Sequence, residues 1–146
     1  MIGTTTCRMA ALILGATLPV TPNADKPDKE VVVTATNPTR FYPRATDVEA
    51  TCEEVDGPVH TLNLGVQDKA DNAGARDAYS VLATKYRRVE GGPIPNNGPG
   101  YARFVAVDAA IEIRAWGDRK DFLVVYTESR LFERLRKFQE QRRNRL

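Results

Sequence analysis

Two stretches of strict alternation between apolar and polar residues predict a β-hairpin in the first half of the chain. The turn signal Asp56-Gly57-Pro58 separates them. With that turn as the loop, position 52 faces 62, 50 faces 64 and 48 faces 66, so every apolar side chain falls on one face of the sheet. The apolar positions are Val48, Ala50 and Cys52 in the first strand and Leu62, Leu64 and Val66 in the second.

A helical stripe follows this hairpin. Its apolar residues recur at spacings of three and four, which places them on one side of a helix. Asp71 or Asn72 is placed to cap the start of the helix, and Gly91-Gly92 is placed to end it. The stripe consists of Ala75, Ala78, Tyr79, Leu82, Tyr86 and Val89.

The remaining segments complete the predicted order of elements. Residues 30–36 are rich in β-branched side chains and predict a short first strand. Residues 91–100 predict a loop, 101–116 predict one bent strand or two, and 121–127 predict another strand. A helix is predicted over 129–146. The order β-ββ-α-ββ(β)-α predicts an α+β domain, with helices packed on one face of a small antiparallel sheet.

Composition supports a single domain of ordinary type. Of the 146 residues, 42% are hydrophobic, 27% charged and 8% aromatic, which excludes a collagen-like chain, a coiled-coil rod and a wholly disordered tail. The 21 Lys and Arg against 19 Asp and Glu give a net charge of +2, so no overall field selects nucleic acid. No apolar run reaches the ~20 residues that cross a bilayer as a helix.

The first 24 residues have the composition of a secretory signal peptide. Arg8 is their only charged side chain before Ala24, which offers a small residue for cleavage, and an uncharged, largely apolar run covers 9–20. The alternative is a buried first strand or helix. Cleavage predicts a periplasmic or secreted chain, with a strand and linker over 25–46, an α+β core over 47–128 and a basic helix over 129–146.

Cleavage also decides the state of the second cysteine. Removal of residues 1–24 would remove Cys7 and leave Cys52 alone. A chain with one cysteine has no internal disulfide. Cys52 is then buried and inert, or links two copies of the chain into a homodimer, or is a reactive thiol.

A thiol-dependent enzyme is the catalytic alternative. In the predicted hairpin His60 lies opposite Glu54 and diagonal to Cys52, where an imidazole could activate a thiolate. The competing interpretation is a core cysteine beside a half-exposed histidine. One His and two Cys do not complete a usual four-ligand zinc site without carboxylates, so we expect no metal and no cofactor.

Positive charge is concentrated at the C-terminus. Residues 129–146 hold seven Arg or Lys and two Glu, a local charge of +5, against −4 for the rest of the mature chain. This predicts an anionic partner, such as a membrane surface or an acidic protein, and export disfavours nucleic acid. The alternative is a solvated basic face. The candidate contact residues are Arg136, Lys137, Arg142, Arg143 and Arg145.

The first strand carries a resemblance to a known family. Residues 30–36, EVVVTAT, resemble the TonB box of TonB-dependent outer-membrane receptors, which implies strand pairing with the periplasmic transducer through Val31, Val32 and Val33. The alternative is that these valines form the first strand of the sheet. The order of elements after Tyr42 is also similar to the β-β-α-β order of the TonB C-terminal domain, which implies a likeness of topology alone.

Together these patterns predict a small exported, non-enzymatic α+β binding domain. It would contact a protein partner, such as an envelope protein, through the strand edge at 30–36. Alternatively, it would contact an anionic surface through the basic C-terminal helix.

Overall fold

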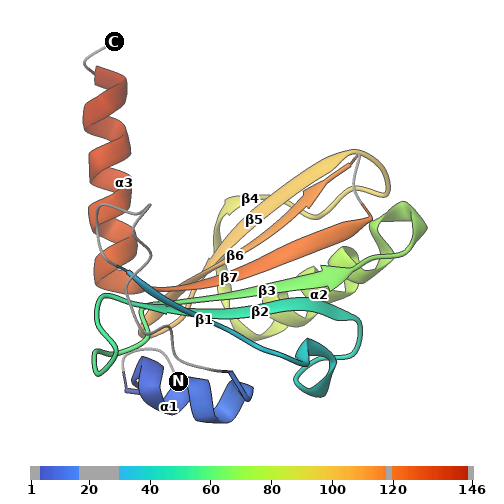
Figure 1. Cartoon of the computed structure of the whole chain (residues 1–146). Coiled ribbons are helices and arrows are strands. Elements are labelled where there is room, and N and C mark those ends of the chain that lie inside the picture. Colours follow the sequence, from blue (N-terminus) through green and yellow to red (C-terminus); the bar gives the residue numbers. More distant parts are fainter. Residues whose placement is uncertain (1–3, 17–29, 118–119, 145–146) are drawn as a thin grey trace.

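The computed structural model describes residues 4–16, 30–117 and 120–144, which form an antiparallel sheet with three α-helices (Figure 1). The strands are β1 (Val31–Thr34), β2 (Ala45–Cys52), β3 (Thr61–Gln67), β4 (Arg87–Gly91), β5 (Pro99–Val105), β6 (Ala109–Trp116) and β7 (Asp121–Glu128). The helices are α1 (Cys7–Leu14), α2 (Ala73–Lys85) and α3 (Ser129–Asn144), with 3₁₀ turns η1 (Pro38–Arg40) and η2 (Ala70–Asn72).

The seven described strands form one sheet in the order β1-β2-β3-β7-β6-β5-β4, and every neighbouring pair is antiparallel. Strands β1 to β3 form one meander and β4 to β7 form another. The two meanders join where β7 pairs with β3, and α2 connects them along the chain. The predicted α+β fold with an antiparallel sheet is confirmed.

The apolar core lies on one face of this sheet. Residues that pair across neighbouring strands point to the same side. One such row contains Val48, Leu64, Val124, Ile113 and Ala102. Helix α1 covers this face over β1 and β2, and α2 covers it over β5 and β6. Leu64 packs against both clusters, so the core continues across the central strands.

Helix α1 is part of this core and is bonded to it covalently. Cys7, Ala10 and Leu14 are among its buried residues. A disulfide joins Cys7 to Cys52, with the two Cα atoms 6.1 Å apart. In the full chain, residues 9–14 of the N-terminal apolar run lie in this partly buried helix. The cleavage point predicted after Ala24 lies outside the described residues.

The disulfide contradicts two roles predicted for Cys52, those of reactive thiol and of link between two copies of the chain. Its sulfur is bonded within the same chain, and neither cysteine is free. In the full chain Cys52 is therefore neither a nucleophile nor a link to a second copy. The prediction missed this bond because it removed Cys7 together with the leader.

The β2–β3 hairpin differs from the predicted register by two positions: Val48 pairs with Leu64 rather than with position 66. The loop is wider because its backbone bonds to the segment before α1. For example, the N–H of Val59 donates to the carbonyl of Thr5 at 2.7 Å. A shift of two positions preserves the side-chain facing, so the apolar residues still share one face.

Helix α2 forms in the predicted region but ends earlier. It stops at Lys85, and 87–91 form β4 at the edge of the sheet, so Val89 belongs to a strand. The start of the helix is capped by the carboxylate of Asp68, which accepts two backbone N–H groups. Asn72, a predicted cap, makes no capping bond and donates its side-chain amide to two loop carbonyls.

Residues 101–116 form two strands, β5 and β6, rather than one bent strand. Their hairpin turn is closed by the N–H of Ala106, which donates to the carbonyl of Ala109 at 2.9 Å. The loop predicted over 91–100 is shorter than expected, because β4 includes Gly91 and β5 begins at Pro99.

Helix α3 leaves the sheet on the side opposite α1 (Figure 1). It contacts β6 and β7 near its start and then extends away from the body. Phe132 lies near the base of this helix, with its ring centroid 4.8 Å from Cζ of Arg103. Arg103 alternates along β5 with the buried Ala102 and Phe104, so its side chain lies on the second face. Helices therefore contact both faces of the sheet, whereas one face was expected.

Candidate binding site at the base of the C-terminal helix

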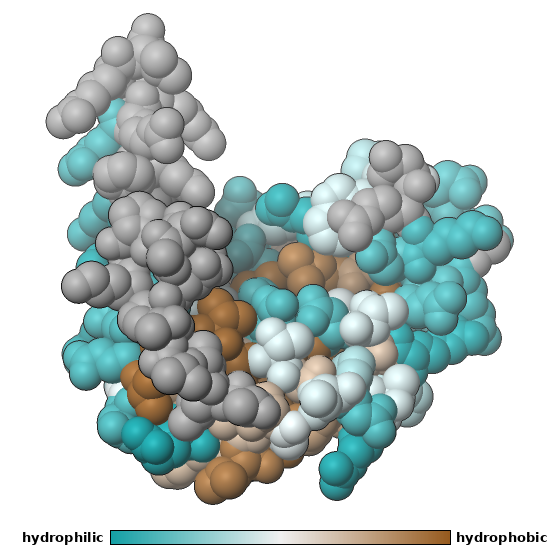
Figure 2. All heavy atoms as spheres, in the orientation of Figure 1, coloured by the Kyte–Doolittle hydropathy of each residue, from teal (hydrophilic) through white to brown (hydrophobic). Residues whose placement is uncertain are grey.

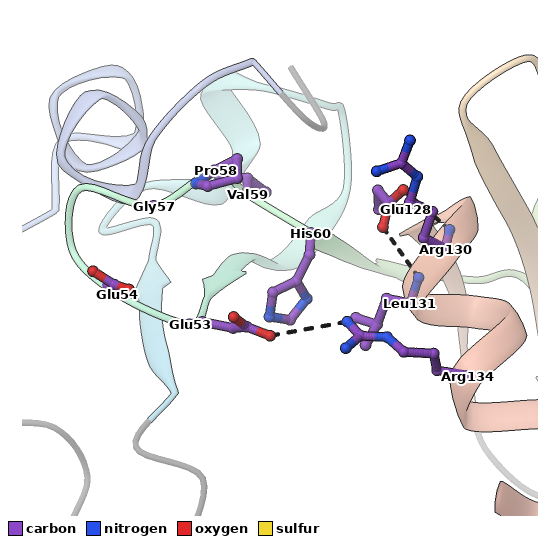
Figure 3. A pocket seen from close by; sticks show the side chains of 10 residues that line it. All are labelled: Glu53, Glu54, Gly57, Pro58, Val59, His60, Glu128, Arg130, Leu131 and Arg134. Atoms are coloured by element: carbon purple, nitrogen blue, oxygen red, sulfur yellow. Dashed lines mark hydrogen bonds and ion pairs between the residues drawn. The ribbon is translucent and has the colours of Figure 1, made fainter.

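A cavity of about 370 Å³ opens between the β2–β3 loop and the first turns of α3 (Figure 3). Glu54 and His60, two members of the predicted catalytic group, line this cavity together with the first turns of the basic helix α3. The lining residues are Glu53, Glu54, Gly57, Pro58, Val59, His60, Glu128, Arg130, Leu131 and Arg134.

The junction of β7 and α3 forms one wall of the cavity. The carboxylate of Glu128 accepts the N–H groups of Arg130 at 3.0 Å and Leu131 at 3.1 Å, and so caps α3. Ser129, the first residue of α3, donates its own N–H to the carbonyl of Asp108 in the β5–β6 turn. The N–H of Glu128 also donates to the carbonyl of His60, just before β3, at 2.7 Å. This bond joins the β7–α3 junction to the end of the β2–β3 loop.

His60 supplies this carbonyl and lies in the cavity. Its Nδ1 is 2.8 Å from Oγ1 of Thr61, and its Nε2 is 3.9 Å from a carboxylate oxygen of Glu30. The imidazole side chain is only 13% exposed. These contacts hold the ring between β3 and the segment that precedes β1.

The predicted grouping of Cys52, Glu54 and His60 does not form. Cys52 is fully buried in its disulfide. Glu54 is exposed and lines the same cavity as His60 (Figure 3), but among the described residues no hydrogen bond or ion pair joins the two. The wider loop separates them, because its backbone bonds to the N-terminal segment instead of continuing the strand ladder. Among the described residues that line the cavity there is no serine, threonine or cysteine to act as a nucleophile.

Both signs of charge line the cavity. Glu53 and Arg134 approach to 4.0 Å, with their side chains 70% and 69% exposed. An ion pair this exposed is screened by water and contributes little stability, so either group can exchange its partner for a ligand. The arrangement suits the binding of a charged or polar partner.

The outer side of the loop is tied to α1 by an exposed ion pair. Nε of Arg8 donates to the carboxylate of Asp56 at 2.7 Å. This hydrogen bond, with the attraction between the charges, raises the pKa of Arg8 and lowers the pKa of Asp56. The backbone also joins the loop to α1, because Cys7 and Arg8 donate their N–H groups to the carbonyls of Gly57 and Val55.

Val31, Val32 and Val33, the predicted strand-edge residues, form most of β1 at one end of the sheet. Val31 and Val33 are buried with α1, whereas Val32 is half-buried. The N–H of Ala35 donates to the carbonyl of Val48 in β2. Because backbone groups alternate in direction along a strand, those of Val32 point away from β2. No described strand pairs with this outer edge.

Helix α3 carries four of the five predicted basic contacts. Lys137 is exposed, and Arg136, Arg142 and Arg143 lie on the helical backbone. Arg145 lies outside the described residues. The basic segment is thus presented on a helix that extends from the cavity (Figure 1).

A polar network that was not predicted from the sequence lies on the second face, beside the base of α3. Arg103 is 9% exposed and donates bonds of 3.0 and 2.8 Å to one carboxylate oxygen of Glu90, while contacting Phe132. Nearby, the hydroxyl of Tyr101 donates to Glu112 at 2.7 Å, and burial together with this bond raises the pKa of Tyr101. The sequence signal that could have predicted this network is the alternation along β5, which places Arg103 on the face opposite the core residues Ala102 and Phe104.

No helix in the described part of the chain is long and apolar enough to cross a membrane. Within the same residues, no group of three or more His, Cys, Asp or Glu is placed to hold a metal ion. Comparisons with protein-family models, curated proteins and solved structures find no match for this chain.

Proposed function

We propose that this chain is a non-enzymatic binding domain that contacts an anionic membrane surface through α3. The observation that carries the proposal is the extension of this basic helix away from the body (Figure 1). A lone helix of 16 residues is marginally stable in water, because most helices depend on packing. A surface that binds α3 would supply the missing stabilisation.

The sequence of α3 favours phospholipid headgroups as that surface. Its 16 residues include six Arg or Lys and two Glu. Leu131, Leu135 and Phe138 recur at helical spacing, the pattern of an amphipathic helix that lies on a membrane. Each cation near an anionic lipid surface adds attraction, and salt screens it.

We expect Arg142→Gln/Arg143→Gln to bind anionic vesicles about tenfold more weakly than the unchanged chain. The vesicles contain phosphatidylcholine and phosphatidylglycerol in equal parts, and co-sedimentation measures binding. Both substitutions remove charge from the part of α3 that is distant from the cavity, so folding should be unaffected.

The matched control is Lys85→Gln/Arg87→Gln, which removes the same charge from exposed positions outside α3. This variant should bind anionic vesicles as the unchanged chain does. Equal binding to pure phosphatidylcholine vesicles, or no binding to either kind, would contradict headgroup recognition by α3.

A second candidate function is strand addition at β1. It is favoured by the position of β1 at the end of the sheet, with the backbone groups of Val32 directed outward. Val32→Pro should abolish binding of the transducer's periplasmic domain, because it removes the outward N–H and leaves the bonds to β2. Val32→Ala keeps the N–H and should bind normally. Calorimetric titration that detects the same affinity for both variants would argue against strand addition.

We also propose that the chain acts in the periplasm or outside the cell. The Cys7–Cys52 bond supports this location, since disulfides persist in oxidising compartments. Intact mass of the extracytoplasmic protein tests it. A full chain lighter by two hydrogen atoms than its reduced form supports export with the disulfide retained. A chain that begins at Asp25 supports export with leader removal. A reduced, full-length chain in the cytosol overturns the proposal.

A further inference from the structure

We propose that the apolar face of the sheet holds a binding site for a free α-amino acid with a bulky apolar side chain. The site is a slot between α2 and the connection from η1 to β2. It is independent of α3 and of the membrane contact proposed above. Two adjoining hollows form it, one apolar and one flanked by charges.

The apolar hollow has the size of a ring or a branched aliphatic group. It measures about 180 Å³, and an enclosed apolar cavity of about 150 Å³ is known to accept benzene. Tyr42 and Val81 form exposed parts of its wall, at 44% and 53% exposure. The lining is completed by Leu64, Val66, Asp77, Ala78, Leu82, Phe122, Val124 and Tyr126.

The second hollow continues from the first. It measures about 310 Å³ and shares Tyr42, Val66, Asp77 and Phe122 with the apolar one. Arg44 joins its lining. A ligand could therefore place an apolar group in the first hollow and a polar end in the second.

Asp77 and Arg44 supply one negative and one positive charge beside the second hollow. Both are exposed, and within the described residues neither side chain makes a hydrogen bond or an ion pair. One carboxylate and one guanidinium beside the same hollow complement an ammonium and a carboxylate on one molecule. An α-amino acid carries both groups on the carbon that bears its side chain.

The backbone at Arg44 supports a positioned role for this residue. Its φ of 66° lies in the left-handed region, which residues other than glycine seldom adopt. Two bonds hold this conformation: Gln67 donates its N–H to the Arg44 carbonyl, and Ala45 donates to the carbonyl of Tyr42. Strained residues that the surrounding structure holds in place are concentrated at binding sites.

The tyrosine hydroxyls add hydrogen-bonding capacity at the apolar end. Within the described residues, neither Tyr42 nor Tyr126 has a hydrogen-bond partner for its hydroxyl. Burial raises the pKa of Tyr126, so its hydroxyl remains a donor at neutral pH. A small apolar pocket with a few convergent polar groups is the usual form of a small-molecule site.

Calorimetric titration of the full chain with L-phenylalanine tests the proposal. Phenethylamine lacks the carboxylate and 3-phenylpropionate lacks the amine, so each should bind about tenfold more weakly than phenylalanine. Glycine, which lacks the apolar group, should not bind measurably. Absence of saturable binding of phenylalanine, or equal binding of either analogue, would overturn the assignment.

Two charge variants assign the ends of the ligand. Asp77→Asn should weaken phenylalanine and phenethylamine about tenfold and leave phenylpropionate unchanged. Arg44→Asn should weaken phenylalanine and phenylpropionate and leave phenethylamine unchanged, and asparagine tolerates the left-handed backbone. Asp71→Asn and Arg40→Gln are matched controls at exposed positions outside the slot. Losses as large in the controls would refute the roles of Asp77 and Arg44.

Discussion

Breaking the Cys7–Cys52 disulfide is expected to lower the free energy of unfolding by about 4 kcal/mol. The bond joins positions separated by 45 residues, and a cross-link over a long loop removes much of the conformational freedom of the unfolded chain. Cys52→Ala is the preferred variant, because Cys52 is fully buried and a serine hydroxyl there would need a new partner. Urea denaturation measures the loss, which corresponds to about 10 °C in Tm.

Cys7→Ala should cost as much as Cys52→Ala, because either substitution removes the same bond. The double variant and the reduced unchanged chain should be no less stable than either single variant by more than about 1 kcal/mol. Backbone bonds between α1 and the β2–β3 loop remain in all of them, so each should still fold. A stability that reductant does not alter, together with two titratable thiols, would contradict the bond.

Helix α1 shows why the apolar run after Arg8 fits both a leader and a buried helix. Helix α1 has apolar residues on both sides: Cys7 and Leu14 face the core, whereas Met9, Leu12 and Ile13 are 47%, 81% and 50% exposed. Figure 2 shows apolar residues gathered at the bottom of its view, where α1 lies. A helix that is apolar all round has no periodic polar face, so its pattern does not distinguish a core helix from a secretory segment.

Strands were predictable where one face is buried and the other is not. The alternation around Val48 and Leu64 identified β2 and β3 and placed their apolar residues on the correct face. Register was not predictable, because the loop bonds to residues 5–8, which are distant in sequence. Local turn chemistry carries no information about such a partner.

The end of α2 shows a different limit. Tyr86 and Val89 continue the helical spacing, yet the chain enters β4 at Arg87. Pairing with β5 at the edge of the sheet outweighs helical spacing there, and the edge position leaves all five residues of β4 exposed. An exposed strand lacks the alternation by which the other strands were recognised.

The candidate site was predictable only in parts. Single residues such as His60 and the arginines of α3 were identified from their chemistry, but their juxtaposition depends on the β3–β7 pairing. That pairing joins the two meanders near the centre of the sheet, between residues about sixty positions apart in sequence. The hollow flanked by Arg44 and Asp77 also depends on tertiary packing, because its lining comes from segments that are distant in sequence.

Glu90→Ala is expected to lower the free energy of unfolding by about 2 kcal/mol, because it leaves the nearly buried Arg103 without its carboxylate. Removing one partner of a fully buried pair costs more, but the side chain of Glu90 is 57% exposed and water offsets part of the loss. Arg103→Met should cost less than Glu90→Ala. The methionine still packs against Phe132, and the carboxylate of Glu90 can return to water.

A double-mutant cycle measured by urea denaturation separates the interaction between Glu90 and Arg103 from the contribution of each residue alone. Glu90→Ala/Arg103→Met should be about as stable as Arg103→Met alone, since the carboxylate has no buried charge left to neutralise. Strictly additive losses would show that the two residues act independently. Because Arg103 also contacts Phe132 at the base of α3, Arg103→Met/Phe132→Ala tests whether the same guanidinium helps hold the helix. Coupling in both cycles would make Arg103 the shared contact between the edge strand β4 and α3.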